Sequence, residues 1–471
     1  MGRHEAGMKD RPLLIPKSSV QGISWPALPG PGGASMLAVQ YQLKESQWWH
    51  GEVLRASQHG QLRRLLAHAF ATVPFYRERF IKAGLDPAAE SCAKTFYTLP
   101  LLRRSEVQAA PDALISRSVP PDHGRVIEHQ TSGSTGRLIR TRGTAITQFF
   151  WNAITLRDHL WHGRDLMGKL ASIRTTVKDG RSSGWGPSTN VAYETGPSVT
   201  LNIRADTATQ MNWLEKEDPD YLLSHPSNIL ALARLSLSLS PSPSPSIDTR
   251  IRMPTLKEVR TFGETVGPDL REACMNAWGV KVVDAYSAQE IGYIALQCPA
   301  SECYHIQSES VLVEILDADG RPCGPGETGR VVITTLHNFA MPLIRYEILD
   351  YAEAGGPCAC GRGLPVIKKV LGRARNMVTL PDGREHWPSF PAEKWAGVAP
   401  VRQLQLVQKS RTEITARIVA DRALGPEEEG RFTVALQESL GYRFLITFEY
   451  LDEIPRKANF KYEDFVSEIQ S

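Results

Sequence analysis

A loop rich in hydroxyl groups and glycine places the strongest constraint on what this chain can fold into and bind. Its residues are Thr131, Ser132, Gly133, Ser134, Thr135 and Gly136. Glycine lets backbone N–H groups approach an anion closely and tolerates a positive φ. Such a loop can form a nest for a phosphate, although a surface loop of serine and glycine has the same composition. It is not the common P-loop, because the chain contains no Gly-Lys-Ser or Gly-Lys-Thr.

The bulk properties of the chain exclude several classes of protein. At about 100–200 residues per domain, its 471 residues predict two to four domains or subdomains. A net charge of +3, from 54 basic and 51 acidic residues, gives no reason to expect nucleic acid or an anionic membrane as a partner. No apolar run reaches the length of about 18 residues that a membrane span requires. The first 35 residues lack the apolar stretch of a signal peptide, so we expect a cytoplasmic protein.

The patterns along the chain predict an α/β protein in two unequal parts. We expect residues 1–35, rich in proline and glycine, to be a disordered leader. Residues 36–374 are predicted to form a large, multi-layered domain with mixed sheets. Within it, residues 235–246 read as a low-complexity insertion. Residues 375–471 have the size of a small α+β domain.

Individual elements are predicted from the spacing of apolar residues. The predicted strands are 280–283, 311–316, 331–335, 404–407, 413–419 and 445–450. The predicted helices are 147–162 and 426–440. Mixed strand and helix signals of this kind favour layered α/β architecture.

Four further segments carry candidate functional residues. In residues 284–292, Tyr286 is followed four positions later by Glu290 at the end of a predicted strand, where open α/β sheets bind ligands. An aromatic ring and a carboxylate so placed can stack on a base and hold magnesium, although a buried tyrosine beside a surface glutamate would look the same. The other three segments are residues 341–350, 372–377 and 454–461.

In this order and spacing, the five segments resemble the adenylate-forming superfamily of acyl-CoA ligases. The phenylacetate–CoA ligase branch is the closer match, on the further segments 73–77, 99–102, 326–336 and 360–362. The resemblance covers about residues 62–465. It implies that ATP converts a small carboxylic acid to an acyl-adenylate and that CoA then displaces AMP. It also implies a mobile C-terminal domain that rotates between the two steps.

The resemblance implies nucleotide-binding roles for several residues. Residues 131–136 would follow the ATP phosphates, and Gly263 and Glu264 would sit beside adenine and the acyl pocket. Tyr286 would pack on adenine. Asp350 would accept hydrogen bonds from both ribose hydroxyls, which suits a carboxylate with two oxygens.

Catalysis would fall to Lys461, Glu290 and Arg373. Lys461 would neutralise charge as the acyl-adenylate and pyrophosphate form, and Lys457 is an alternative that spacing leaves open. Glu290 would bind magnesium, and Arg373 would contact ribose or phosphate. Arg375 falls at the hinge before the small domain.

Three functions remain open from the sequence. The first is an acid–CoA ligase acting on an aryl or related acid. The second is an adenylating enzyme whose acceptor is an amine, a hydroxyl or the thiol of a carrier protein. It is favoured by departures from the family pattern in the hinge and small domain, the pair Arg375-Asn376 and Phe460, and the large domain also departs from the pattern at Gln289 and Leu138. The third is a nucleotide-binding relative without turnover. The sequence also leaves open whether the chain forms a homodimer.

Cysteines cluster late in the large domain. Five of the seven cysteines, with His305, fall between residues 298 and 360. Structural zinc takes four Cys or His ligands, and the spacing here resembles a zinc-binding feature of some members of the branch. The predicted zinc ligands are Cys298, His305, Cys358 and Cys360, with Cys303 in reserve. Free buried cysteines beside an ordinary loop histidine are the alternative.

The walls of an acyl pocket are harder to predict. The aromatic candidates are Phe149, Phe150, Trp151, Trp185 and Tyr193. Each is equally well explained as an ordinary core residue. Basic pocket residues would select an acidic substrate, but the sequence alone does not place any there.

Overall fold

The structure is a computed structural model. It describes residues 14–131, 139–175, 177–238, 253–388, 398, 400–454 and 462–469. The predicted phosphate loop from Ser132 to Gly136 lies outside the described residues, as do the side chain of Thr131 and both candidate lysines, Lys457 and Lys461. Most of the predicted low-complexity insertion, from residue 239 onward, is also outside them.

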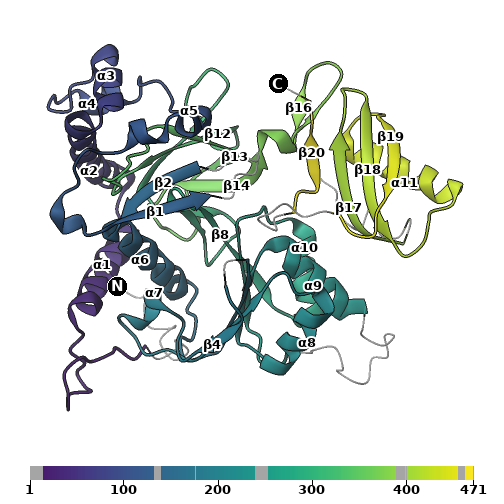
Figure 1. The fold of residues 1–471 in the computed structure, drawn as a ribbon, viewed down its shortest axis with the longest axis horizontal. Coiled ribbons are helices and arrows are strands. Elements are labelled where there is room, and N and C mark those ends of the chain that lie inside the picture. Colours follow the sequence, from purple (N-terminus) through teal and green to yellow (C-terminus); the bar gives the residue numbers. More distant parts are fainter. Residues whose placement is uncertain are drawn as a thin grey trace.

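A twelve-stranded mixed sheet forms the centre of the large part of the molecule (Figure 1). In spatial order its strands are β11 (Val311–Leu316), β12 (Thr328–Thr335), β13 (Tyr346–Gly355), β14 (Val366–Arg373), β10 (Tyr304–Ile306), β9 (Gly292–Gln297), β8 (Lys281–Ala288), β7 (Glu258–Phe262), β6 (Tyr221–Ser224), β3 (Leu170–Arg174), β5 (Ser198–Asn202) and β4 (Gly180–Ser182). Strands β8, β7, β6, β3 and β5 run parallel, whereas the other neighbouring pairs are antiparallel. The predicted α/β class with a mixed sheet is confirmed.

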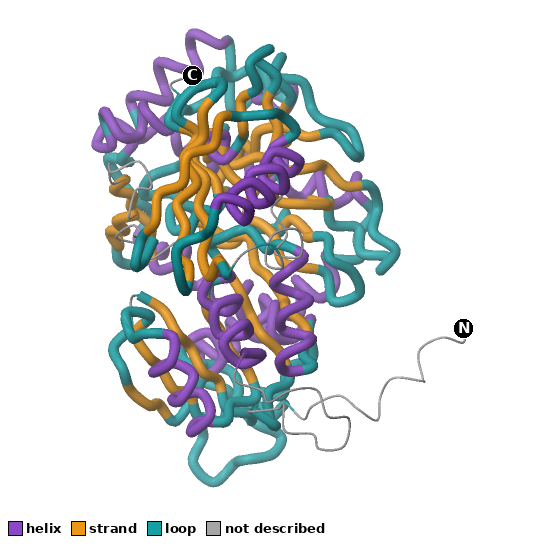
Figure 2. Tube along the Cα trace, turned by 90° about the vertical axis from the view of Figure 1, so that its right-hand side faces the viewer, coloured by secondary structure: helices purple, strands orange, loops and turns teal. Residues whose placement is uncertain are grey.

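The parallel strands separate apolar from polar side chains by the two-residue period of a β-strand. In β3, Ala171 and Ile173 join an apolar cluster with three helices, while Ser172 and Arg174 point to the other face. The helices in that cluster are α8 (Thr207–Glu217), α9 (Pro226–Ser238) and α10 (Pro268–Trp278). Figure 2 shows helices and strands layered in this way. The sheet therefore has one sealed apolar face at β3, and its other face carries polar side chains.

Three helices lie beyond the polar face of these strands. They are α1 (Pro31–Ser46), α6 (Ala145–Trp161) and α7 (Pro187–Asn190). Helices α1 and α6 share a smaller apolar cluster with β8, β9 and residues 191–193, which follow α7. Thr144 caps α6, since its hydroxyl accepts a hydrogen bond from the N–H of Thr147 at 3.4 Å. The predicted helix at 147–162 is thus confirmed, beginning two residues earlier.

The other helices pack on the antiparallel end of the sheet. They are α2 (Gly51–Thr72), α3 (Pro74–Ala83), α4 (Cys92–Phe96) and α5 (Arg104–Ala109), with the 3-10 turns Pro111–Leu114 and Pro121–His123. Their buried side chains form the largest apolar cluster with β9 to β14. A separate hairpin, β1 (Val126–Thr131) and β2 (Ile139–Thr144), flanks the predicted phosphate loop.

The C-terminal region forms a second, smaller sheet beside the first (Figure 1). Its strands, in order, are β19 (Leu445–Tyr450), β18 (Glu413–Ala420), β17 (Val401–Gln408) and β20 (Phe465–Ser467), and α11 (Pro426–Leu440) packs on it. The 3-10 turn η3 (Ala374–Asn376) and a short hairpin, β15 (Val378–Thr379) and β16 (Glu385–His386), precede it. Pro426 begins α11 and Gly441, at φ 70°, ends it. The predicted strands and helix of this region are confirmed.

Two expectations need correction. Part of the predicted disordered leader is packed, because Pro16 forms a β-bridge with Tyr193 and α1 begins at Pro31. The strand predicted at 280–283 extends to Ala288 as β8. Its polar residue Asp284 is tolerated inside the sheet because Thr261 and Tyr304 donate hydrogen bonds to it, at 2.7 and 2.9 Å.

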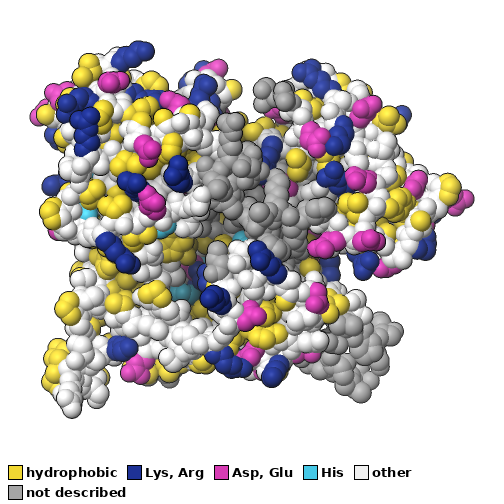
Figure 3. All heavy atoms as spheres, in the orientation of Figure 1, with side chains coloured by type: hydrophobic (Ala, Val, Ile, Leu, Met, Phe, Trp, Pro, Cys, Tyr) yellow, Lys and Arg dark blue, Asp and Glu magenta, His cyan; other side chains and the backbone are white. Residues whose placement is uncertain are grey.

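Two whole-molecule features agree with the bulk composition. Among the described residues, no helix has both the length and the apolar character needed to cross a bilayer. On the face shown in Figure 3, basic and acidic side chains are interspersed. That mixture matches the small net charge of the chain.

Candidate functional site

A cleft of about 2150 Å³ opens at the carboxyl ends of the parallel strands. Its wall includes residues at the ends of β3, β6, β7 and β8, and the C-terminal region contributes residues from β17 and from the segment 462–465. Open α/β sheets bind ligands at this edge. Residues from both sheets therefore line the cleft. Most of the described site residues predicted from the sequence are among them.

Tyr286, Asp350 and Arg373 meet at one end of this cleft. The Tyr286 hydroxyl donates to Asp350 Oδ2 at 2.8 Å, and Arg373 Nε donates to Asp350 Oδ1 at 3.3 Å. Asp350 and Arg373 face each other in the β13–β14 ladder. Burial, and then the charge of Asp350, raise the pKa of Tyr286 well above its ordinary value, so the phenol stays protonated. The three residues form a preorganised polar triad.

Glu290 follows β8 and lies next to a partner that sequence reasoning missed. Arg104 Nη1, at the start of α5, is 3.2 Å from Glu290 Oε1 and 3.2 Å from the hydroxyl of Tyr346. Both side chains of the ion pair are only 6% exposed. Arginine on a helix is usually a surface residue, so the sequence held no signal for this buried pair.

The base of the predicted phosphate loop lies beside the same turn. His129, on β1, is 3.5 Å from the amide of Gln289, measured from Nδ1 to Nε2. The neighbour of Gln289 in the chain is Glu290, and β1 ends at Thr131. The strand that leads into residues 132–136 therefore passes beside the turn that carries Glu290.

Glu264 connects the cleft to the C-terminal segment. Its carboxylate accepts hydrogen bonds from the N–H and hydroxyl of Ser227, at 2.9 and 3.2 Å. It also accepts one from the backbone N–H of Tyr462 at 3.0 Å. The preceding residue, Gly263, has φ +79°, which favours glycine. Tyr462 directly follows Lys461 in the chain, so this contact brings the C-terminal segment to the cleft.

The predicted hinge residues also contact that segment. Arg375 forms an ion pair with Glu463, and the Asn376 amide donates to the backbone oxygen of Phe465 at 2.7 Å. Because Arg375 and Asn376 belong to η3, these contacts tie the connection between the sheets to β20.

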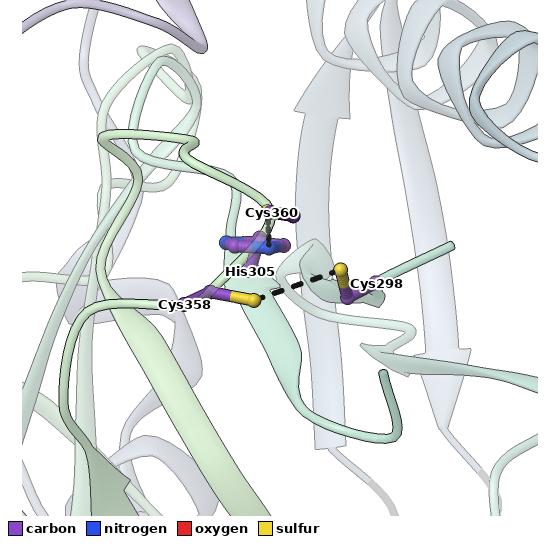
Figure 4. Close-up of side chains that lie close together, drawn as sticks. All are labelled: Cys298, His305, Cys358 and Cys360. Atoms are coloured by element: carbon purple, nitrogen blue, oxygen red, sulfur yellow. Dashed lines mark hydrogen bonds between the residues drawn. The ribbon is translucent and has the colours of Figure 1, made fainter. Parts of the chain in front are cut away.

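The predicted sulfur and imidazole ligands lie close together (Figure 4). The potential ligand atoms of Cys298, His305, Cys358 and Cys360 all lie within 4.8 Å of one another. Cys298 Sγ is 3.8 Å from Cys358 Sγ, and Cys360 Sγ is 3.3 Å from His305 Nε2. Cys303, the reserve, lies outside this set, although its sulfur is 3.6 Å from Cys358 Sγ.

The surroundings of this Cys/His cluster keep its imidazole neutral. His305 is fully buried, with its ring edge-on to Trp161 at 5.8 Å between centroids. Burial, and then the charge of Arg362, lower the pKa of His305 to about 4. A neutral imidazole is the form that binds metal ions.

The aromatic candidates divide between cleft and core. Trp151 and Trp185 line the cleft. Tyr193 is buried in the cluster around α6, and Phe149 packs against it. Phe150 stacks on His337 with 3.8 Å between ring centroids. Two of the five candidates are therefore cleft residues.

Sequence comparisons identify relatives over most of the chain. Residues 393–468 match the family model described as the CapK C-terminal domain. A phenylacetate–coenzyme A ligase of Thermus thermophilus is 26% identical over 349 residues, covering 70% of this chain and 72% of that protein. One of Pseudomonas putida is 25% identical, with the same coverage. The chain is thus similar to phenylacetate–coenzyme A ligases over about 70% of its length. The predicted resemblance is thereby confirmed.

Structural comparison places this phenylacetate–CoA ligase-like chain in the adenylate-forming fold. It is similar to a 2-hydroxyisobutyryl-CoA ligase in the postadenylation state in complex with R3-HIB-AMP, with a TM-score of 0.68 and 18% identity. The similarity covers 90% of this chain and 92% of the other. Both sheets therefore take part in the shared fold.

Proposed function

We propose that the protein is an ATP-dependent acid–CoA ligase. It would convert a carboxylic acid, of the aryl class, to an acyl-adenylate and then transfer the acyl group to the thiol of CoA. The observation that carries this proposal is the convergence of Tyr286, Asp350, Arg373 and Glu290 at one end of a single cleft. These residues come from strands or turns far apart in the sequence.

The polar triad suits a nucleotide. Tyr286 offers a rigid ring from β8, and Asp350 offers two oxygens held in place by Tyr286 and Arg373. A carboxylate fixed in this way can accept hydrogen bonds from two neighbouring hydroxyls. We assign the ribose to Asp350, adenine to the face of Tyr286, and ribose or phosphate to Arg373.

The reaction needs positive charge around the phosphates. The substrate carboxylate attacks the α-phosphorus of ATP, an acyl–phosphate bond forms, and pyrophosphate leaves. Both reactants are anions, so stabilising the charge that develops is the main task of the site. Glu290, a carboxylate beside the base of the loop 131–136, has the donor type that magnesium prefers. Magnesium would reduce the repulsion between the two anions.

In the second step, the CoA thiol attacks the acyl carbon and AMP leaves. An amine, a hydroxyl or a carrier-protein thiol would follow the same course, so the acceptor must be tested directly. We propose that residues 375–376 form the hinge for a movement of the C-terminal domain between the steps. Lys461, or Lys457, is proposed as the lysine of the adenylation step.

Pyrophosphate exchange tests the first step. With ATP, magnesium and a panel of aryl acids, we expect acid-dependent incorporation of labelled pyrophosphate into ATP. Adding CoA, hydroxylamine or a carrier protein then identifies the acceptor. Lys461→Ala and Lys457→Ala, measured in parallel, should separate the two lysines. Absence of exchange and of ATP binding would contradict the proposal.

We also propose that the Cys/His cluster holds a structural zinc. In a tetrahedral zinc site with Zn–S bonds of about 2.3 Å, neighbouring sulfurs are about 3.8 Å apart, and Cys298 and Cys358 have this separation. Three thiolates and an imidazole would fill all four positions, so the metal would join the β9–β10 turn to the loop before β14 and take no part in catalysis.

Metal analysis tests this assignment. Protein produced with zinc should contain about one zinc per chain by mass spectrometry, and Cys360→Ser should lose it. Cys303→Ser is the matched control and should keep the zinc. Zinc loss in Cys303→Ser together with retention in Cys298→Ser would show that the reserve ligand is the true one. A wild-type protein without metal would refute the site.

A further inference from the structure

The far end of the cleft carries an arginine, Arg174, that no described side chain neutralises. Arg174 is the last residue of β3 and lines the cleft. Its Nε atom is buried and has no hydrogen-bond partner within the part of the chain that the structure describes. Among the described residues, no ion pair includes Arg174 either. Burying a hydrogen-bond donor in this way costs free energy unless a ligand supplies the acceptor.

The sheet register places Arg174 on the same face as a second arginine. Ser172 pairs with Leu223, and Leu223 pairs with Arg260. These three residues share one row across β3, β6 and β7, and Arg174 lies two residues further along β3 on the same face. All four line the cleft. The two guanidinium groups therefore face the space between the sheet and α6.

The second arginine, in contrast, is neutralised by carboxylates. Arg260 Nη2 is 2.5 Å from Asp158 Oδ2, which also accepts from Arg164 Nη1 at 2.7 Å. Arg164 Nε in turn donates to Glu258 at 2.5 Å. Two arginines and two carboxylates thus balance each other. Lys281, at the surface, is a further partner of Glu258.

No described acidic residue of this group is left for Arg174. His159, which also lines the cleft, adds no charge, because burial and then Arg260 and Arg164 hold its pKa well below its ordinary value. Burial lowers the pKa of Arg174 while Tyr293 raises it, but an arginine remains protonated in proteins at neutral pH. Among the described residues, the positive charge of Arg174 therefore has no carboxylate to balance it.

The position of Arg174 separates it from the nucleotide end. Between β3 and β8, which carries Tyr286, lie β6 and β7, so the two strands are about 14 Å apart at about 4.8 Å per step. The lining of the same cleft also includes the rings of Trp151, Trp185 and Tyr293. This space suits the body of an acyl group whose reacting carboxylate lies near the nucleotide.

We propose that the substrate is a carboxylic acid with a second anionic group, which the Arg174 guanidinium binds at the far end of the acyl pocket. This inference rests on the proposed adenylation. The reacting carboxylate would be activated at the Tyr286–Asp350 end of the cleft. The second carboxylate, or a chemically similar anion, would form a bidentate ion pair with the guanidinium of Arg174. The aromatic rings that line the cleft would pack on the acid's body.

Matched pairs of acids test the proposal in pyrophosphate exchange without CoA. Terephthalate and isophthalate carry a second carboxylate where 4-methylbenzoate and 3-methylbenzoate carry a methyl group, and suberate and octanoate form an aliphatic pair. We expect wild-type kcat/KM to favour the dianionic member of at least one pair by about 30-fold or more. The methyl acid leaves the buried Arg174 without its anionic partner, and removing one partner of a buried ion pair weakens binding by at least this factor. Omitting CoA ensures that any role of Arg174 in binding CoA leaves the ratio unchanged.

Substitution of Arg174 should remove this preference. Arg174→Met keeps length and removes the charge, so it should lower kcat/KM for the dianionic acid and leave the methyl acid unchanged or improved. Arg174→Lys should retain part of the preference. Arg181→Met, at a position 65% exposed in its ion pair with Glu217, is the control and should behave as the wild type.

Binding of acyl-sulfamoyl adenosines gives a second readout that needs no turnover. The 4-carboxybenzoyl compound should bind the wild type more tightly than the 4-methylbenzoyl compound, and Arg174→Met should reverse the order. Equal binding of both compounds, or a preference for the methyl compound in the wild type, would overturn this inference alone. Failure of both compounds and of ATP to bind would overturn the proposed function as well.

Discussion

At the end of the cleft proposed for the nucleotide, Glu290 pairs with Arg104 and Asp350 pairs with Arg373. At the end proposed for the acyl group, Arg174 has no ionic partner among the described residues. The two ends share one sheet edge and one cavity. Paired charges hold their side chains in place before a ligand arrives, which reduces the reorganisation that binding and reaction require. An unpaired charge gains its partner from the ligand and therefore discriminates between ligands.

Removal of the central acceptor at the nucleotide end should have the largest effect. Asp350→Ala deletes both oxygens assigned to ribose and leaves Tyr286 and Arg373 without their shared acceptor. We expect kcat/KM for ATP in pyrophosphate exchange to fall about 100-fold, the loss expected for two hydrogen bonds to a charged group. Asp319→Ala, at a carboxylate 69% exposed, is the control. An Asp350→Ala enzyme with normal kinetics for ATP would show that ribose binds elsewhere.

The next largest effect should be a loss of stability when one partner of the buried Arg104–Glu290 ion pair is removed. Arg104→Met leaves Glu290 charged, buried and without its ion pair, so the free energy of unfolding should fall by about 3 kcal/mol. The double variant Arg104→Met/Glu290→Gln should recover much of this loss, because no uncompensated charge remains. Denaturant unfolding followed by circular dichroism measures both.

An exposed ion pair provides the matched control for Arg104. Lys368, 64% exposed, lies 2.7 Å from Glu353, and Lys368→Met should change the free energy of unfolding by less than about 1 kcal/mol. Equal losses for Arg104→Met and Lys368→Met would mean that the Arg104–Glu290 pair is not buried in solution.

The sequence predicted some of these residues and not others, for physical reasons. Cysteine and histidine are rare and chemically specific, so the four residues of the Cys/His cluster could be selected before the structure brought them together. Arg104 could not, because nothing near it in the chain marks a partner 186 positions away. Arg174 is one basic residue in a short apolar strand, and only the sheet register shows that it faces the cleft.

The fold was predicted best where apolar spacing is regular. Helix α11 matches its predicted bounds because Pro426 and Gly441 mark its ends. Strand β8 was predicted too short because Asp284 and Ser287 interrupt its apolar run. Buried polar residues of this kind depend on partners from other strands, which local sequence does not reveal.

A smaller effect should follow from changing only the hydroxyl of Tyr286. Tyr286→Phe keeps the ring proposed to pack on adenine and removes the 2.8 Å hydrogen bond to Asp350. We expect the Kd for ATP, measured by calorimetry, to rise about three- to tenfold, as expected for one hydrogen bond. Tyr286→Ala should cause a clearly larger rise. Similar values for the two variants would argue against a stacking role for the ring.

An effect visible only as a pH dependence concerns the carboxyl of Asp284, which lies on β8 two residues before Tyr286. Burial raises the pKa of Asp284 to about 6, although Thr261 and Tyr304 donate hydrogen bonds to it and lower the pKa in part. In the unfolded chain its pKa is about 3.9, so between these values the folded state binds more protons than the unfolded state. Its contribution to stability is therefore complete below about pH 4 and is lost as the pH rises through about 6.

Asp284→Asn should remove this pH dependence, because the amide does not titrate in this range. We expect the unfolding free energy of the wild type, relative to that of the variant, to decrease from pH 4 to pH 6.5 and then to level off. The comparison of the two proteins cancels the many other titrating groups, which both share. A difference that instead increases with pH would mean that the folded state favours the ionised carboxylate, and Asp284 would then belong with the paired charges of the nucleotide end.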